Sequence, residues 1–462
     1  MRSSSPAAPA HSSEASSVSP GWRWILGVGA AAFLFLMFLE SISRGRAPDG
    51  LRFQAWTSER LMQTLSLKHL RDEPLSSLWY LHIQPPLLDM FRAVLAQVYR
   101  SRDGAALVDA VDQGTYVAWA VVFAVTAALV FVWIHALAGR RLALGATALW
   151  VMHPGALAFA TLLDSTAASA AAFLWFCFEL WRLSRSQGSV VRLAVASLVL
   201  FFLRSVFQWP FLLLVVLCLV LLRLPRRQVL RYGAVTGLVL GLYIAKQLVL
   251  FGTPLTSTFN GLNLCRAVGL GEPDISALQV PRERFPASLP PPSRAAVLRD
   301  EEKIGGFYNY NHLDYLRYSV GLRYACSQAL REQPLSATLA SFAENLALYG
   351  QPSSRYQPNV LVDSLPWRGA FDFVFSAPVF WLLLLAMGAS AARRLKRSED
   401  WRRVAALALP ILYVAAITIL FEKGENMRFR YFLEPVLFVF FCAELRELAL
   451  RSRSGRQLRA EP

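Results

Sequence analysis

The chain has 462 residues, of which 55% are hydrophobic and only 17% are charged, whereas a typical globular domain is about 25% charged. Soluble domains of this total size have too little interior for so much apolar surface, so the composition excludes an ordinary soluble protein. The net charge of +16 fits either a nucleic-acid binder or a membrane protein with basic loops on one side of the bilayer. The positions of the charges distinguish these two classes.

Apolar runs recur along the chain after a polar start. Residues 1–21 are rich in Ser, Ala and Pro, and they predict a disordered tail because such a composition buries little surface. The candidate transmembrane helices that follow are residues 24–38, 116–137, 142–163, 167–181, 193–203, 209–222, 232–251, 371–391, 404–421 and 431–443. Arg204, Gln208 and Pro210 interrupt the apolar stretch between 192 and 223, which predicts a tight turn between two spans.

This pattern predicts an all-α polytopic membrane protein with about ten transmembrane helices. Amphipathic helices are expected in the first extracytoplasmic loop, and a small extracytoplasmic cap is expected in the long middle loop. The predicted parts are the tail 1–21, an N-terminal membrane module 22–251 of about seven helices that includes the loop 44–113, the cap 252–370, a three-helix module 371–448 and a basic tail 449–462.

Basic residues gather in the loops between alternate spans. The clusters are Arg140 and Arg141; Arg182, Arg185 and Arg192; Arg223, Arg226, Arg227 and Arg231; Arg393, Arg394, Lys396, Arg397, Arg402 and Arg403; and Arg451, Arg453, Arg456 and Arg459. With ten helices these clusters all fall on one side, so both termini are expected in the cytoplasm. The basic excess therefore predicts topology in a lipid bilayer, most simply a bacterial inner membrane, and no nucleic-acid partner.

Two cysteines are predicted to share the far side of the membrane. Cys265 and Cys326 both lie in the middle loop, where a disulfide between them is an open alternative. Cys177, Cys218 and Cys442 lie in predicted spans, where a thiol behaves as a small apolar group.

The loop 44–113 contains polar residues that chemistry could use. Asp49 lies in a Pro-Asp-Gly turn soon after the first span, and its simplest interpretation is a turn residue. Apolar residues between 51 and 65 are spaced loosely like one face of a helix on the bilayer surface. His82 and Gln84 precede two prolines that are expected to begin a helix at Leu87.

The sequence has none of the common catalytic or metal-binding motifs. It contains no HExxH, no CxxC pair, no GxSxG and no phosphate-binding glycine loop. No metal site is predicted, and no cofactor is required; a divalent metal is an alternative that no residue pattern indicates.

A set of residues resembles the C-type integral membrane glycosyltransferases. Asp49 after the first helix, the Pro-Pro-Leu run ending at Leu87, and Arg430 and Tyr431 opening the last span carry the likeness. The nearest branch uses lipid-linked sugars and includes protein O-mannosyltransferases and the aminoarabinose transferase that acts on lipid A. Gly50 stands where that family has a second carboxylate.

The resemblance implies transfer of a sugar from a polyprenyl-phosphate donor to an extracytoplasmic acceptor, in a site that faces the periplasm. Asp49 would be the general base in a single displacement that inverts the anomeric carbon. Contacts with the substrates are predicted for His82, Gln84, Asp164, Asn263 and Tyr431.

Three arginines are candidates for holding the donor phosphate. Arg204, Arg428 and Arg430 lie at predicted far-side helix ends, against the positive-inside rule, and an arginine fork suits phosphate oxygens. Salt bridges to nearby glutamates are the alternative.

Two other functions stay open: a polymerase or ligase of surface polysaccharide with a related fold, and a transporter, which would account for Lys246 inside the seventh span.

Overall fold

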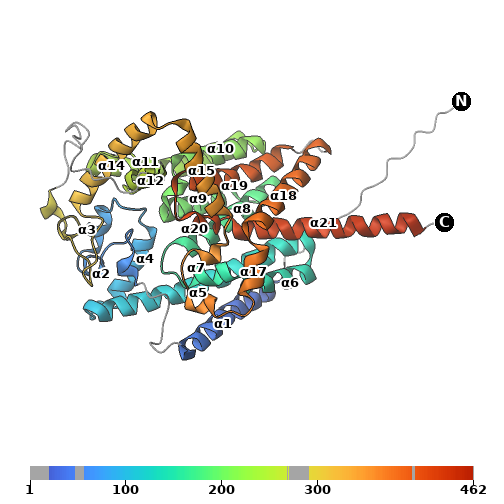
Figure 1. Ribbon diagram of the computed structural model, residues 1–462, viewed down its shortest axis with the longest axis horizontal. Helices are drawn as coiled ribbons and strands as arrows, with labels where there is room; N and C mark the ends of the chain where they lie inside the picture. The colour runs from blue at the N-terminus through green and yellow to red at the C-terminus, as the bar shows by residue number, and fades with distance from the viewer. Residues whose placement is uncertain (1–19, 47–56, 268, 270–290, 398–400, 461–462) are drawn as a thin grey trace.

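The computed structural model describes residues 20–46, 57–267, 269, 291–397 and 401–460. The regular elements of these residues are all helices, and no strand occurs among them (Figure 1). The prediction of an all-α protein is therefore confirmed for the described part. Asp49 and the neighbouring residues 47–56 lie outside the described residues.

Helices occupy all ten predicted apolar runs. Among the described residues, four helices are long and apolar enough to cross a membrane, and two bent pairs raise the number to six if each pair is one span. The four are α1 (Trp22–Arg46), α5 (Gly104–Ala138), α11 (Arg226–Phe251) and α19 (Trp401–Phe421). The bent pairs are α6 (Arg140–Val151) with α7 (Pro154–Ala160), and α17 (Arg368–Val374) with α18 (Ala377–Arg397). These apolar helices are compatible with an integral membrane protein.

The remaining predicted runs form helices that do not meet the length and composition of a span. These are α8 (Thr166–Ser184), α9 (Val190–Leu203), α10 (Trp209–Leu221) and α21 (Glu434–Ala460). The turn expected after residue 203 is confirmed, because Arg204 ends α9 and the short helix η2 (Ser205–Phe207) leads into α10. Helix α21 continues into the predicted basic tail.

The residues that the structure describes form two hydrophobic cores. The larger lies between the long helices and contains large side chains such as Trp133, Trp150 and Phe173. The smaller lies among α2 (Leu67–Asp72), α3 (Pro74–Trp79), α4 (Leu87–Val98), the start of α5, α12 (Asn260–Ala267), α13 (Ala296–Arg299) and α14 (Leu313–Glu332), at the left of Figure 1. The first loop and the first part of the middle loop therefore share one core, and the boundary predicted between them does not separate two packing units.

The second part of the middle loop packs against the larger core. Helices α15 (Leu335–Gly350) and α16 (Val360–Asp363) bury Tyr349 and Leu361 there. The predicted cap 252–370 is thus divided between the two cores. The junction between the cores is where the candidate site lies.

The amphipathic helix expected between residues 51 and 65 is not present in its described part. Only the short helix η1 (Ser58–Arg60) forms, and regular α-helix begins at Leu67. The backbone N–H groups of Leu65 and Leu67 are bound by the carboxylates of Asp89 and Glu59, so side chains replace the helical hydrogen bonds. The helix expected from Leu87 is confirmed as α4.

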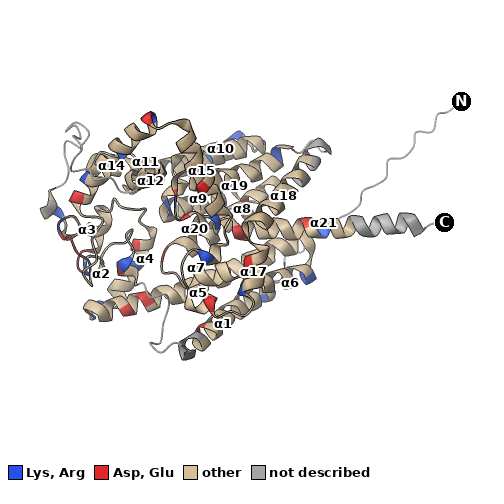
Figure 2. Ribbon diagram, viewed as in Figure 1, with Lys and Arg blue, Asp and Glu red and all other residues tan. Residues whose placement is uncertain are grey.

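The basic ends of several helices meet at one end of the molecule. The Arg140 guanidinium, at the start of α6, lies 5.1 Å from the ring centroid of Trp24 in α1. Arg446 of α21 donates to the carbonyl of Leu137 at the end of α5. Figure 2 shows blue residues at the end of α6, with the long helices mostly tan between their ends. The side of a membrane that this end of the molecule faces stays a prediction.

The two far-side cysteines are bonded to each other. The Cys265–Cys326 disulfide joins α12 to α14 across 61 residues of sequence. Cys177, Cys218 and Cys442 are buried free thiols. The alternative that the sequence left open is therefore decided in favour of a disulfide.

Replacing Cys265 by serine is expected to lower the stability of the cap. A disulfide that closes a long loop commonly contributes about 2–4 kcal/mol, because it limits the conformations of the unfolded chain. The temperature of thermal denaturation of the full chain should be lower in Cys265→Ser than in the parent. Reduction of the parent should lower it by the same amount. If denatured, unreduced parent protein reacts with a thiol reagent at five cysteines rather than three, the disulfide is absent.

Candidate functional site

A polar pocket lies at the junction of the two cores. Its volume is about 110 Å³, and its wall comes from the segment after η1, the connection between α7 and α8, the end of α9, α12 and α20 (Asn426–Arg430). The charged residues that line it are Arg60, Asp164, Arg204, Arg266, Glu425 and Arg428. We call it the arginine pocket. It brings together Gln84, Asp164, Arg204, Asn263 and Arg428 of the residues predicted from the sequence.

Arg428 is held in the pocket by two carboxylates. Its Nη2 lies 2.5 Å from Asp164 Oδ2, and its Nη1 lies 2.6 Å from Glu425 Oε2. The Nε group donates to Thr166 Oγ1 at 2.8 Å. Asp164 is fixed in turn by the backbone N–H and hydroxyl of Thr166 at the start of α8. These contacts therefore fix the position of the Arg428 guanidinium, and the two carboxylates largely neutralise its charge.

Arg204 is the buried arginine of the pocket that no described carboxylate contacts directly. Its Nη1 donates to Gln63 Oε1 at 3.2 Å and to Ser165 Oγ at 3.5 Å, and its guanidinium lies over the Phe429 ring. It forms no ion pair with any carboxylate in the part of the chain that the structure describes. Burial, followed by the positive charge of Arg428, lowers the pKa of Arg204 to about 10. A buried cation without a contacting carboxylate is costly, and binding of an anion beside it would reduce that cost.

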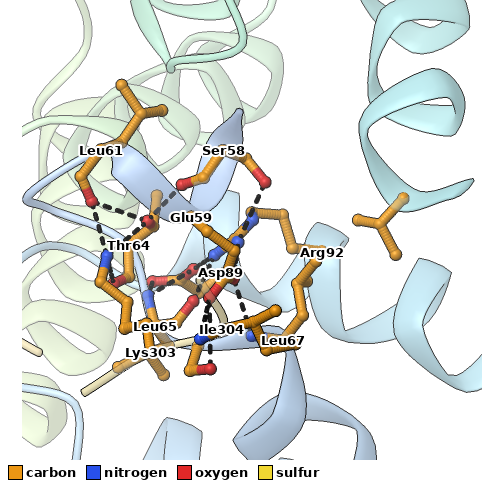
Figure 3. A network of polar contacts seen from close by, with 12 residues as sticks. Ser58, Glu59, Leu61, Thr64, Leu65, Leu67, Asp89, Arg92, Lys303 and Ile304 are labelled. Atoms are coloured by element: carbon orange, nitrogen blue, oxygen red, sulfur yellow. Dashed lines mark hydrogen bonds and ion pairs between the residues drawn. The ribbon is translucent and has the colours of Figure 1, made fainter. Parts of the chain in front are cut away.

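A buried network holds one wall of the arginine pocket in place (Figure 3). Arg92 lies between two carboxylates, with Nη1 2.8 Å from Asp89 Oδ1 and Nη2 2.9 Å from Glu59 Oε1. Lys303 Nζ donates to the carbonyls of Leu61 at 2.8 Å and Thr64 at 3.0 Å. We call Glu59, Asp89, Arg92 and Lys303 the clamp.

The clamp fixes the conformation of the backbone that lines the arginine pocket. Residues 60–64 form part of the pocket wall, and Glu59 at their start also accepts from the Leu67 N–H at 2.8 Å. Gln84, another lining residue, donates to Asp89 Oδ2 at 2.9 Å. Residues 57–66 are thus anchored by buried charges, although η1 is the one short helix within them.

An apolar groove adjoins the arginine pocket. Its volume is about 690 Å³, and α4, α5, α8 and α9 supply its walls. Leu88 lines both the groove and the pocket, and Leu203 of the groove directly precedes Arg204. The wall residues, such as Phe91 and Trp175, are nearly all apolar. A molecule with a long hydrocarbon part and an anionic head would fit the two spaces together.

Arg430 lies away from this pocket and is fully engaged. Its Nε is 2.9 Å from Glu434 Oε1, and its other nitrogens donate to the carbonyls of Gly350, Gln351 and Phe375. It is completely buried. The geometry assigns it to joining α20 and α21 to the end of α15, and it does not line the arginine pocket.

His82 and Tyr431 also lie outside the arginine pocket. The His82 ring bonds to Thr258 Oγ1 and to the carbonyl of Asn311, both at 3.0 Å, and burial lowers its pKa to about 3. It is a neutral ring that ties the first loop to the cap. Tyr431 is buried in the larger core, with its ring stacked 4.6 Å from that of Phe159.

Lys246 bonds to the first loop. Its Nζ donates to the carbonyl of Leu81 at 3.2 Å and lies 5.9 Å from the Trp79 ring centroid. The neighbouring Gln247 donates to the same carbonyl at 3.0 Å. These contacts explain why Lys246 and Gln247 lie near the end of an apolar helix, so the pair does not require a transported ion.

Glu422 stands beside the arginine pocket in an unusual electrostatic setting. It accepts from Asn263 Nδ2 at 3.1 Å, and Asn263 lines the pocket. Burial and the negative charge of Glu425 raise the pKa of Glu422 to about 8, against the opposing effect of Arg204 and Arg428. Glu422 therefore holds its proton more tightly than an ordinary glutamate.

Any anion in the arginine pocket is expected to bind more weakly as the pH rises through about 8. Loss of the Glu422 proton places a new negative charge near Arg204 and Arg428, which opposes an anionic ligand. Affinity for undecaprenyl phosphate between pH 7 and pH 9 should fall by up to about tenfold, the factor that corresponds to one pKa unit. Glu422→Gln should remove most of this fall; an unchanged pH dependence in that variant would contradict the role of Glu422.

Several site residues have no clear signal in the sequence. Gln63, Tyr356 and the clamp residue Lys303 come from segments without a motif, and only the fold brings them to the pocket. Asp89 and Arg92 do carry a signal, because their spacing of three residues places opposite charges on one face of a helix.

No metal site or relative adds to this geometry. Among the described residues, no three His, Cys, Asp or Glu side chains form a group that could hold a metal ion. No protein-family model, curated protein or solved structure matches the chain. The function is therefore inferred from the residues themselves.

Proposed function

We propose that the protein is a membrane glycosyltransferase that moves a sugar from a polyprenyl phosphate to a hydroxyl group of an extracytoplasmic acceptor. The observation that carries the proposal is Arg204, a buried arginine without a carboxylate partner in the described chain, placed between a polar pocket and an apolar groove. The isoprenoid chain would occupy the groove and the phosphate would face Arg204. Arg428 would make a second contact from its fixed position.

The reaction needs a base and a stabilised leaving group. The acceptor hydroxyl oxygen forms a bond to the anomeric carbon, while the bond from that carbon to the phosphate oxygen breaks. The electron pair stays on the phosphate, where Arg204 and Arg428 stabilise the charge that develops. Asp49 is the proposed base for the hydroxyl proton, since it is close in sequence to the clamped wall, and Gln84, Asp164 and Asn263 would contact the sugar.

The proposed topology places the arginine pocket on the extracytoplasmic side. Ten spans would put both termini in the cytoplasm of a bacterial inner membrane. The basic helix ends that meet at one end of the molecule support this orientation. The disulfide supports an oxidising compartment for the cap.

Asp49→Asn is expected to slow sugar transfer by about 10²–10⁴-fold, the range for loss of a general base. The measurement is the lipid-linked sugar that remains after incubation of the purified variant with a lipid extract and surface glycans from a strain that lacks the protein. Mass spectrometry of the same extract identifies the sugar, because the unused donor accumulates in that strain.

The variants separate the proposed reaction from its nearest alternative. A polysaccharide polymerase or ligase that needs no base would keep its rate in Asp49→Asn and lose it in Arg204→Gln. A transferase of the proposed kind loses its rate in both. Transfer by Asp49→Asn at the parental rate would contradict the assignment of the base.

A further inference from the structure

A second polar pocket adjoins the arginine pocket. Its volume is about 250 Å³, and η2, α12, α14 and α19 contribute to its wall. Asn263 lines both pockets, so the two spaces meet at that side chain. Ser205, Gln208 and Asn260 also line the second pocket, and in the described chain their side chains have no hydrogen-bond partner. We call it the amide pocket.

The lining groups of the amide pocket suit a ligand rich in hydroxyls. Primary amides donate and accept hydrogen bonds, and a serine hydroxyl does both, so each can pair with sugar hydroxyl groups. Apolar side chains, among them Ile417 and Phe421, form another part of the wall, which suits the C–H face of a sugar ring. This chemistry differs from the salt-bridged arginine pocket beside it.

One cation in the amide pocket has no carboxylate partner. Arg323 of α14 lines the pocket and makes no ion pair or hydrogen bond in the part of the chain that the structure describes. Burial lowers the pKa of its guanidinium, which remains charged at neutral pH. Cys326, one helical turn further on, joins this part of α14 to α12 and so fixes the distance between Arg323 and Asn260.

Among the described residues, the one carboxyl group that lines the amide pocket has a partner of its own. Glu422 accepts a hydrogen bond from Asn263, and burial together with the negative charge of Glu425 raises its pKa. Glu425 and the other arginines lie on the side of the arginine pocket. Arg323 therefore gives the amide pocket a positive charge that no described carboxylate contacts, which favours an anionic ligand.

We propose that the amide pocket binds an acidic sugar of the acceptor, either a uronate or a sugar phosphate, with Arg323 holding the anionic group and the amides holding the hydroxyls. This inference rests on the proposed function, because the donor sugar must stay next to its own phosphate in the arginine pocket. A bound acceptor can present a hydroxyl at Asn263, where the two pockets meet.

A cysteine reporter tests this site in the full chain. Ser205→Cys places a thiol on the pocket wall, while the native cysteines are either buried in helices or paired in the disulfide. Labelling by a neutral maleimide in nanodiscs is timed with no sugar, with glucose, with glucuronate and with glucose 6-phosphate. Size-exclusion chromatography confirms that each variant is folded.

One or both acidic sugars should slow labelling by about threefold or more, which corresponds to a site about two-thirds occupied, and glucose should have little effect. Arg323→Gln in the same background should abolish this protection, while Arg323→Lys should retain part of it. The matched control is Arg317→Gln, an exposed arginine of α14 paired with Asp314, which should leave protection unchanged. If only glucuronate protects, the acidic group of the ligand is a carboxylate; if only glucose 6-phosphate protects, it is a phosphate.

Three outcomes would overturn the inference: no protection by either acidic sugar, equal protection by glucose, or full protection in Arg323→Gln. A failure of the proposed function gives a different result. Undecaprenyl phosphate would then bind no better to the parent than to Arg204→Gln, while the protection by acidic sugars would still depend on Arg323.

Discussion

Replacing Arg204 by glutamine is expected to reduce sugar transfer by about 10²–10³-fold, the usual loss when one donor that stabilises a developing anion is removed. Arg204 is buried and lacks a carboxylate partner in the described chain, so its charge is available to the leaving phosphate. The variant should still fold, because Gln63 and Ser165 are neutral partners that lose only hydrogen bonds.

Two measurements check this prediction. Transfer is followed as consumption of the lipid-linked sugar, and binding is followed as retention of undecaprenyl phosphate by protein in nanodiscs. Arg317→Gln is the matched control, since it removes an exposed arginine in the same type of substitution. If Arg204→Gln binds the lipid and transfers the sugar as the parent does, Arg204 does not hold the phosphate.

Replacing Arg92 by methionine is expected to be the most destabilising single change. The substitution keeps the volume but leaves Asp89 and Glu59 buried without the cation between them. Breaking one partner of a buried ion pair commonly costs about 3–5 kcal/mol, because the remaining charge is left uncompensated. Lys303 stays near the carboxylates but is bonded to backbone carbonyls.

Arg92→Met should lower the stability of the fold and should also loosen the segment 57–67, part of which lines the arginine pocket. Thermal denaturation of Arg92→Met in detergent should occur well below that of the parent, and limited proteolysis should cut first in the segment 57–67 that the clamp holds. Arg317→Gln, which breaks an exposed pair, should change stability by about 1 kcal/mol or less. A parental denaturation temperature in Arg92→Met would show that the clamp does not hold this segment. Adding Glu59→Gln to Arg92→Met should recover part of the loss, because one buried charge is then removed.

The helices were predictable because apolar composition alone identifies them. Each of the ten runs is helical in the structure, and the break at Arg204 follows from polar residues and a proline inside an apolar stretch. Composition does not fix the number of spans, because length and charge qualify only four helices of the described chain, or six with the bent pairs.

The site was predictable only in part. Arg204, Asp164 and Arg428 share a pocket because the end of α9, the segment before α8 and the short helix α20 meet there. Arg430 is only two residues from Arg428, yet it points to Glu434 and the carbonyls at the end of α15. Two residues along a helix turn the side chain to the opposite face, and the sequence does not say which face meets the pocket.

The clamp and the amide pocket depend on contacts between distant segments. Glu59 and Lys303 are separated by more than half of the chain, and they meet because the first loop and the cap share a core. No local pattern encodes that pairing. The disulfide was equally undetermined, because one pair of cysteines without a spacing motif specifies nothing.

Photo-crosslinking with a polyprenyl phosphate that carries a diazirine in its isoprenoid chain tests the central claim most directly. We predict labelled peptides from α4, α5 and α8, which line the groove beside Arg204, and loss of that labelling in Arg204→Gln. A second apolar groove of about 320 Å³, lined by α17, α18 and α21, provides an internal comparison. Labelling confined to that groove, or labelling of the first groove that is unchanged in Arg204→Gln, would contradict the proposed donor site.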